Sequence, residues 1–192
     1  MKRLSALMIA ALLCVCLLAA CGGNSGGNSA EQSTTADSTE SPAVTGETFD
    51  AGNVSAIVPA GWKAFPQKDV FADDKDATNP DTFYVAKGAE NELDLFSKPY
   101  ILIYHYAPTT TMIAPSKNFY DDAVDLPDMT IGEHTWHGFT CNSLGYKYHM
   151  LWTGENNEDQ FQVSVLYEST DGSVKLEDAD VQAIIASVKA SK

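Results

Sequence analysis

The chain is 192 residues long, and about 145 of them remain once two unusual N-terminal segments are set aside, which is the size of one ordinary domain. Lys2 and Arg3 lie at the extreme N-terminus, whereas all 26 acidic residues lie beyond residue 30. A chain that begins at Cys21 therefore carries 10 lysines, no arginine and 26 acidic residues, a net charge of −16. So negative a surface repels phosphate groups, which argues against nucleic acid and anionic lipid headgroups as partners.

The first 21 residues have the anatomy of a signal peptide. Residues 1–3 are a short cationic start, and residues 4–20 are apolar or small apart from Ser5. This run ends in Leu18-Ala19-Ala20-Cys21, which resembles the lipobox of bacterial lipoproteins. The resemblance implies removal of residues 1–20, acylation of the Cys21 thiol and anchoring to the outer face of a bacterial membrane. An uncleaved signal anchor is the alternative.

A tether is expected between the lipid and the folded domain. Residues 22–47 contain no aromatic residue and consist mainly of Gly, Ser, Thr, Asn, Ala and acids. Such a segment cannot bury enough apolar surface to offset the entropy lost on ordering. We therefore expect residues 21–47 to form a lipidated cysteine and flexible acidic linker, and residues 48–192 to form a single domain.

Apolar periodicity predicts about six strands in this domain. They fall at residues 54–58, 82–86, 100–106, 139–143, 146–152 and 161–167. The run 100–106 is so continuously apolar that we expect a central strand covered on both faces. An acidic, turn-rich loop is expected at residues 69–81.

The last three strands predict a meander whose register follows from matching apolar faces. The expected pairs are Phe139–Met150 and Cys141–Tyr148 in the first hairpin, and Trp152–Phe161, Met150–Val163 and Tyr148–Val165 in the second. Each pair places two apolar side chains on the same face of the sheet, so this register predicts one buried face shared by all three strands.

Two helices are predicted. Ser116 is the expected N-cap of the first, which runs through Val124 before Pro127 ends it. The second covers residues 176–189 and carries an apolar stripe at helical spacing, formed by Val181, Ile184, Ile185 and Val188. That stripe is expected to pack on the sheet.

Three motifs punctuate the domain in order. They are a strand leading into Val58-Pro59-Ala60-Gly61-Trp62, then Ile131-Gly132 with Trp136-x-Gly138, and a closing helix Val181-x-Ala183-Ile184-Ile185-x-Ser187-Val188. In this order they resemble the PsbP-like superfamily, which includes the LpqN-type bacterial lipoproteins. The resemblance implies an α+β fold, with a central antiparallel sheet of about six strands and helices on its faces. It also implies an exported accessory or binding protein rather than an enzyme, and it transfers no functional residue.

Cys141 is the only cysteine after residue 21, so no disulfide can form within the domain. A nucleophilic thiol would need a histidine nearby, and His149 is the closest candidate along the hairpin. The expected register turns the two side chains to opposite faces. We therefore predict a buried, inert thiol, with an oxidation-sensitive or a catalytic thiol as the alternatives.

Two groups of residues raise the hypothesis of a metal site. His134 and His137 offer two imidazoles, but residues three apart on an extended segment face opposite ways. Asp74, Asp76 and Asp81 offer carboxylates in the acidic loop, but their spacing departs from an EF-hand. Surface histidines and a solvated loop are expected, with weak zinc or copper binding and loose calcium binding as the alternatives.

Aromatic residues raise the hypothesis of a surface for sugars or peptides. Tyr104, Tyr106 and Trp136 are the three whose exposure would indicate it. Aromatic residues at alternate strand positions are more often part of a core.

No motif commits the chain to a chemistry. The sequence has no Gly-rich phosphate loop, no Gly-x-Ser-x-Gly and no His-Glu-x-x-His, so no cofactor and no catalytic residue is assigned. The expected function is that of a membrane-anchored extracytoplasmic lipoprotein, a binding or accessory module for a protein or another envelope component. The alternatives are a metal- or small-ligand-binding lipoprotein, and an enzyme of unrecognised type that uses His137, His149 and nearby acids.

Overall fold

The computed structural model describes residues 44–154 and 158–191. The predicted signal peptide, Cys21 and most of the predicted linker lie outside the described residues. Strand β1 (Gly46–Asp50) begins two residues before the predicted domain boundary at residue 48. No helix in this part of the chain has the length and hydropathy needed to cross a membrane.

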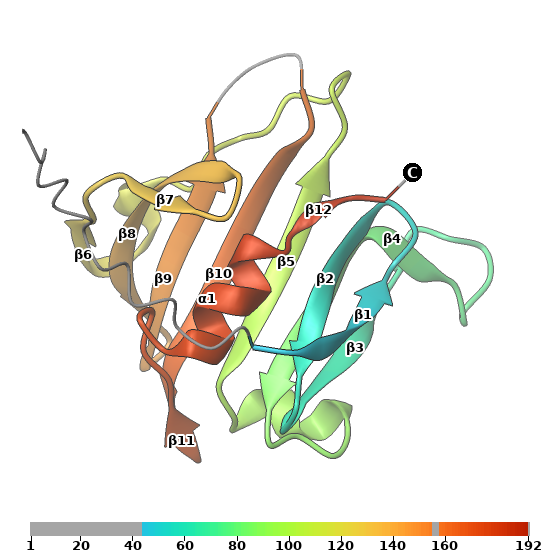
Figure 1. The fold of residues 1–192 in the computed structure, drawn as a ribbon, viewed down its shortest axis with the longest axis horizontal. Coiled ribbons are helices and arrows are strands. Elements are labelled where there is room, and N and C mark those ends of the chain that lie inside the picture. Colours follow the sequence, from blue (N-terminus) through green and yellow to red (C-terminus); the bar gives the residue numbers. More distant parts are fainter. Residues whose placement is uncertain (1–43, 155–157, 192) are drawn as a thin grey trace, which may run out of the picture. The chain divides into compact units, whose positions relative to one another are not determined.

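A nine-stranded antiparallel sheet forms the larger layer of the domain (Figure 1). Its main path runs β3-β4-β5-β10-β9-β8-β6, and β11 and β7 pair with β10 and β8. The strands are β3 (Trp62–Lys68), β4 (Thr78–Lys87), β5 (Tyr100–Tyr106), β6 (Asp121–Asp125), β7 (Met129–Ile131), β8 (His134–Ser143), β9 (Tyr146–Thr153), β10 (Gln160–Ser169) and β11 (Gly172–Ser173).

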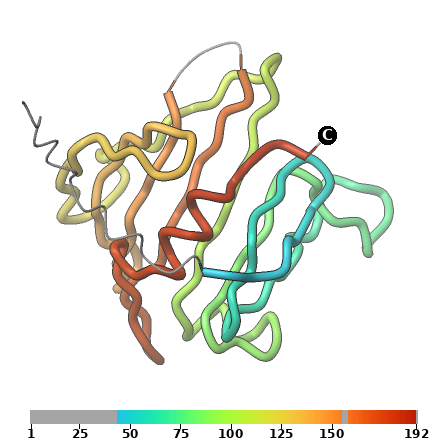
Figure 2. The backbone as a smooth tube through the Cα atoms, viewed as in Figure 1, coloured from blue at the N-terminus to red at the C-terminus, as the bar shows by residue number. Residues whose placement is uncertain are grey.

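A second layer covers one face of this sheet. It consists of a small sheet, in which β2 (Val54–Pro59) pairs with β1 and with β12 (Lys189–Ala190), and of helix α1 (Ala179–Ala186). The path of the tube in Figure 2 shows α1 leading directly into β12. Two short 3-10 helices, η1 (Glu92–Phe96) and η2 (Lys117–Phe119), lie in the connections.

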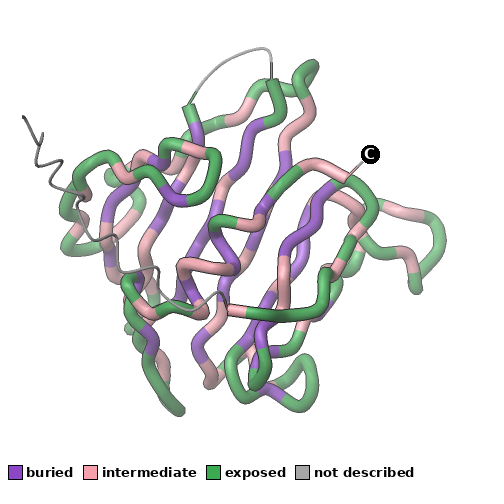
Figure 3. The backbone as a smooth tube through the Cα atoms, viewed as in Figure 1, coloured by how far each residue is buried: buried purple, intermediate pink, exposed green. Residues whose placement is uncertain are grey.

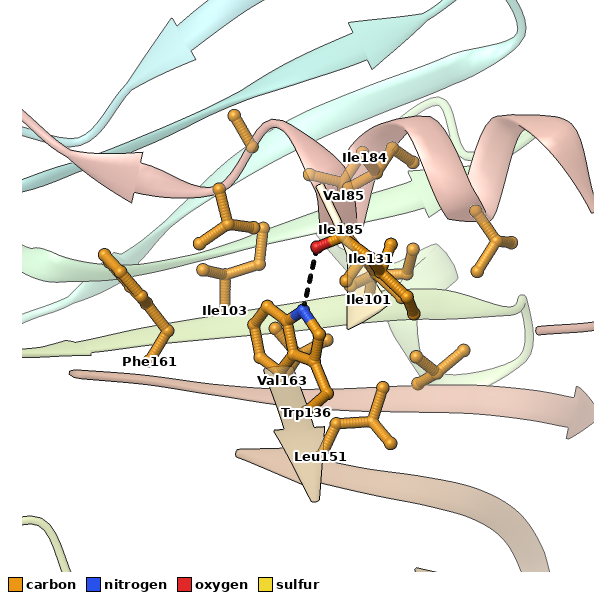
Figure 4. Packing of buried hydrophobic residues seen from close by; sticks show 14 of the residues in the cluster. Val85, Ile101, Ile103, Ile131, Trp136, Leu151, Phe161, Val163, Ile184 and Ile185 are labelled. Atoms are coloured by element: carbon orange, nitrogen blue, oxygen red, sulfur yellow. Dashed lines mark hydrogen bonds between the residues drawn. The ribbon is translucent and has the colours of Figure 1, made fainter. Parts of the chain in front are cut away.

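The main hydrophobic core lies between the two layers (Figure 4). Trp136 and Ile103 of the large sheet and Ile184 and Ile185 of α1 are fully buried there. The Trp136 indole N–H donates to the Ile131 carbonyl at 3.2 Å, so its polar atom is satisfied within the core. The predicted apolar stripe of the last helix does pack on the sheet, although the helix is shorter than expected.

The predicted α+β sandwich, with helices on the faces of a six-stranded sheet, is wrong. Strands make up 52% of the described residues and helices 11%, so this part of the chain is mostly β. The helix expected from Ser116 is instead the short turn η2 followed by β6. Asp121 and Val124 of β6 pair with Asn142 and Thr140 of β8, and this ladder supplies the backbone hydrogen bonds that a helix would have made internally.

Strand β5 is central, as predicted, but its two faces differ. Buried and half-buried residues alternate along it, which is visible in Figure 3. Ile101 and Ile103 point into the main core, whereas Tyr100 and Tyr104 on the other face remain half-buried. The expectation that the strand is covered on both faces is therefore wrong, because the second layer lies on one face alone.

The first hairpin of the meander has the predicted register, and the second is displaced by one residue. Val163 pairs with Leu151 rather than Met150, and Met150 pairs with Ser164. Leu151 consequently enters the core beneath α1, while Met150 joins a second apolar cluster with Phe139 on the opposite face. The prediction failed because it assigned all apolar residues of the three strands to one face.

Candidate functional site

The face of the large sheet that points away from α1 is rich in tyrosine, and we name it the tyrosine face. Its members on the three central strands are Tyr100, Leu102, Tyr104 and Tyr106 of β5, Gln160, Gln162, Ser164 and Leu166 of β10, and Tyr146, Tyr148, Met150 and Trp152 of β9. They share one face because side chains alternate along each strand. Each of them is uncharged, in a protein with a large excess of acidic residues.

A groove of about 420 Å³ opens at one end of the tyrosine face. This volume falls in the range of small-molecule sites, roughly 300–1,000 Å³. Four strands contribute its floor, and η1, the β8–β9 turn and β3 surround it. The lining residues are Pro66, Gln67, Lys68, Tyr84, Glu92, Leu93, Leu95, Phe96, Tyr100, Leu144, Tyr146, Tyr148 and Leu166.

The tyrosines of the groove are ordered by contacts with one another and with the wall. The ring centroids of Tyr84 and Tyr100 are 5.3 Å apart in an edge-to-face arrangement. The hydroxyls of Tyr100 and Tyr148 lie 3.4 Å apart, and the Tyr146 hydroxyl donates to the Phe96 carbonyl at 3.1 Å. Burial raises the pKa of Tyr84 and of Tyr100, so both remain neutral phenols at physiological pH.

One wall of the groove, η1, is fixed by a capping box. The Asn91 side chain accepts the Leu93 N–H at 3.0 Å, and the Asp94 carboxylate accepts the N–H groups of Glu90 and Asn91. Those two hydrogen bonds, the one from Glu90 first, lower the pKa of Asp94. The capped turn presents Leu93 and Phe96 at the rim, each 75% exposed.

Leu144 stands on the opposite rim in an unfavourable backbone conformation. It is 96% exposed, and its φ is 51°, followed by Gly145 at 85°. A two-residue hairpin turn with both φ values positive normally holds Asn-Gly or Gly-Gly, because a side chain at the first position is strained. An exposed leucine at this position gains nothing for the fold, and local strain of this kind clusters at functional sites.

The structure separates the three aromatic residues that the sequence suggested for binding. Tyr104 and Tyr106 lie half-buried on the tyrosine face, beyond the groove lining. Trp136 is 0% exposed and belongs to the core beneath α1, so its proposed role at a surface is wrong. Tyr84 and Tyr100 were missed. The alternation of aromatic residues within 100–106 would have pointed to Tyr100, had that run not been interpreted as covered on both faces.

The predicted metal-binding histidines are not brought together. His134 points to the helix side of β8, where its ring contacts Trp136 and its Nε2 lies 3.3 Å from the Val188 carbonyl oxygen. His137 lies on the other side, with Nδ1 2.7 Å from an oxygen of Asp128. The carboxylates of the acidic loop are used locally instead.

Asp74 accepts the Asp76 N–H, Asp76 pairs with Lys68, and Asp81 lies 3.0 Å from His105 Nδ1. Across residues 44–154 and 158–191, no three His, Cys, Asp or Glu side chains are grouped so that they could hold a metal ion.

Cys141 and His149 point to opposite faces of the hairpin, as the register of β8 and β9 requires. The thiol is 2% exposed, and burial raises its pKa to about 11. His149 stacks on Tyr167 with ring centroids 4.2 Å apart on the helix side. His137 belongs to the face of Cys141, so His137 and His149 do not converge on one pocket either.

Comparison with protein-family profiles, with curated proteins and with solved structures finds no match. The functional argument therefore rests on the chemistry of the groove.

Proposed function

We propose that the protein is a membrane-anchored extracytoplasmic lipoprotein that binds an apolar organic ligand in the groove of the tyrosine face. The observation that carries the proposal is the gathering of three exposed apolar side chains, Leu93, Phe96 and Leu144, around a groove with a tyrosine floor. Apolar surface in water is unfavourable, and an exposed patch of it at a concave site is typical of a contact surface.

Anchoring is supported by the sequence of residues 1–21 alone. Two or three acyl chains would hold Cys21 firmly in the bilayer, since each buried methylene contributes about 0.8 kcal/mol. Mass spectrometry of the membrane fraction should find a diacylglyceryl group on Cys21, and Cys21→Ser should release the protein from that fraction. A free thiol at Cys21 in the native protein would contradict the anchor.

Photo-cross-linking in living cells tests the groove whatever the identity of its ligand. The photoreactive residue p-benzoylphenylalanine replaces Leu144 or Leu93 at the rim, and it replaces Val70 in a matched control. Val70 is also apolar and 81% exposed, but it lies in the turn between β3 and β4 and does not line the groove.

Ultraviolet irradiation should attach the same discrete mass at both rim positions and leave the Val70 control unmodified. Mass spectrometry of the purified protein detects the adduct. No adduct at the rim, or the same adducts at all three positions, would contradict the proposed binding site.

A further inference from the structure

The groove presents aromatic rings from several directions. Five of its lining side chains are aromatic: Tyr84, Phe96, Tyr100, Tyr146 and Tyr148. The face of an aromatic ring carries negative electrostatic potential and attracts cations, most strongly where water is excluded. A site surrounded by such rings suits a cation that is weakly hydrated.

The charges in and around the groove point the same way. Lys68 is its single basic lining residue, and its Nζ lies 3.6 Å from an oxygen of Asp76. Glu92, the single acidic lining residue, has no ion-pair partner within the described ranges. The lining thus has no free positive charge for a carboxylate or phosphate, and the strongly negative protein attracts cations to its surface.

From the aromatic lining, the apolar rim and the excess negative charge, we infer that the groove binds a small organic cation with an apolar body, of the quaternary ammonium class. This inference rests on the proposed function and names the class of ligand for the same site. A strongly hydrated inorganic cation would leave the rim leucines exposed, and an organic anion would meet Glu92 and a repulsive field.

An isosteric pair of probes separates charge from shape. Acetylcholine and 3,3-dimethylbutyl acetate have the same outline, but the second has a neutral carbon in place of the ammonium nitrogen. The full chain in dodecyl maltoside is titrated with each probe, and the probe's methyl protons are followed by NMR. Ring currents in the groove should move these signals upfield for the cation, which should bind about tenfold more tightly than its neutral isostere.

Raising the salt concentration should reduce that advantage, because ions screen the long-range part of the attraction. Variants of Tyr148 identify the ring as its source. Tyr148→Leu keeps apolar bulk and should weaken acetylcholine binding about tenfold while leaving the isostere unaffected. Tyr148→Phe keeps the ring and should retain acetylcholine binding. Tyr106→Leu is the matched control, since Tyr106 lies on the same face outside the lining.

Equal affinity for the two probes, no binding of either, or unchanged acetylcholine binding by a folded Tyr148→Leu variant would each overturn the inference. Thermal unfolding of the variants establishes that they are folded. If the cross-link at Leu144 persists in these cases, the groove still binds a ligand and only the cationic class is wrong. If that cross-link is absent as well, the proposed function fails with it.

Discussion

Gly132, in the turn between β7 and β8, makes the contact between that turn and the end of α1 testable. Its φ is 65°, and a Cβ at this position would lie 2.4 Å from the carbonyl oxygen of Ala186 and 2.7 Å from its Cα. Gly88, which follows β4, has the same φ of 65°, and a Cβ there would have no neighbour within 4 Å. Substituting each glycine by alanine therefore separates backbone strain from crowding.

The two variants share one cost and differ in another. A left-handed conformation costs an alanine about 1–2 kcal/mol at either position. Crowding adds about 1–3 kcal/mol at Gly132, because the backbone of α1 cannot rotate away as a side chain would. For a domain of this size 1 kcal/mol corresponds to roughly 2–4 °C, so the Tm of Gly132→Ala should lie about 2–12 °C below that of Gly88→Ala.

Urea unfolding followed by circular dichroism measures both free energies, with the slope of each transition used to verify that the two variants unfold the same surface. Equal destabilisation by Gly132→Ala and Gly88→Ala would refute the packing of this turn on α1. The groove lies on the other face of the sheet, so neither substitution should change ligand binding.

Three further predictions concern buried titratable groups. Burial raises the pKa of Cys141 from 9.0 to about 11, so its thiol should resist iodoacetamide at pH 8 until the protein unfolds; the stability it contributes is present below pH 9 and lost as the pH rises through 11. Rapid alkylation of the folded protein would contradict this. Burial lowers the pKa of His149 below 6.5, so stability should fall as the pH drops below 6.5, and His149→Phe should flatten that dependence in urea titrations. An unchanged slope would exclude His149 as the cause. His105 lies 3.0 Å from Asp81 and 2.7 Å from Asp159, so His105→Leu should lower the free energy of unfolding by about 1–3 kcal/mol, whereas Asp159→Asn, which keeps an acceptor, should cost less. The reverse order would show that the charge of Asp159, rather than its hydrogen bond, is what matters.

Local patterns were sufficient for the six longest apolar segments. Each predicted strand lies within an observed strand, because alternation of apolar and polar residues depends on consecutive positions only. Strands with weak patterns were missed, among them β3, which contains Pro66, and β6, whose sequence is Asp-Asp-Ala-Val-Asp. These two strands lie at the ends of the main sheet path, where a single neighbour supplies their hydrogen bonds. Pairing with that neighbour, rather than their own composition, makes them strands.

The lipid anchor and the charge of the chain follow from the sequence alone, and the anchor stays a prediction. The sequence also determined where the strands of the meander lie and the register of its first hairpin, because a tight turn links neighbouring segments. Tertiary structure decided which face each strand of the second hairpin presents and that the second layer covers one face of the sheet. It also decided the groove, whose aromatic side chains come from β4, η1, β5 and β9. Residues so far apart in the chain meet only through the pairing of strands, and no local pattern records that pairing.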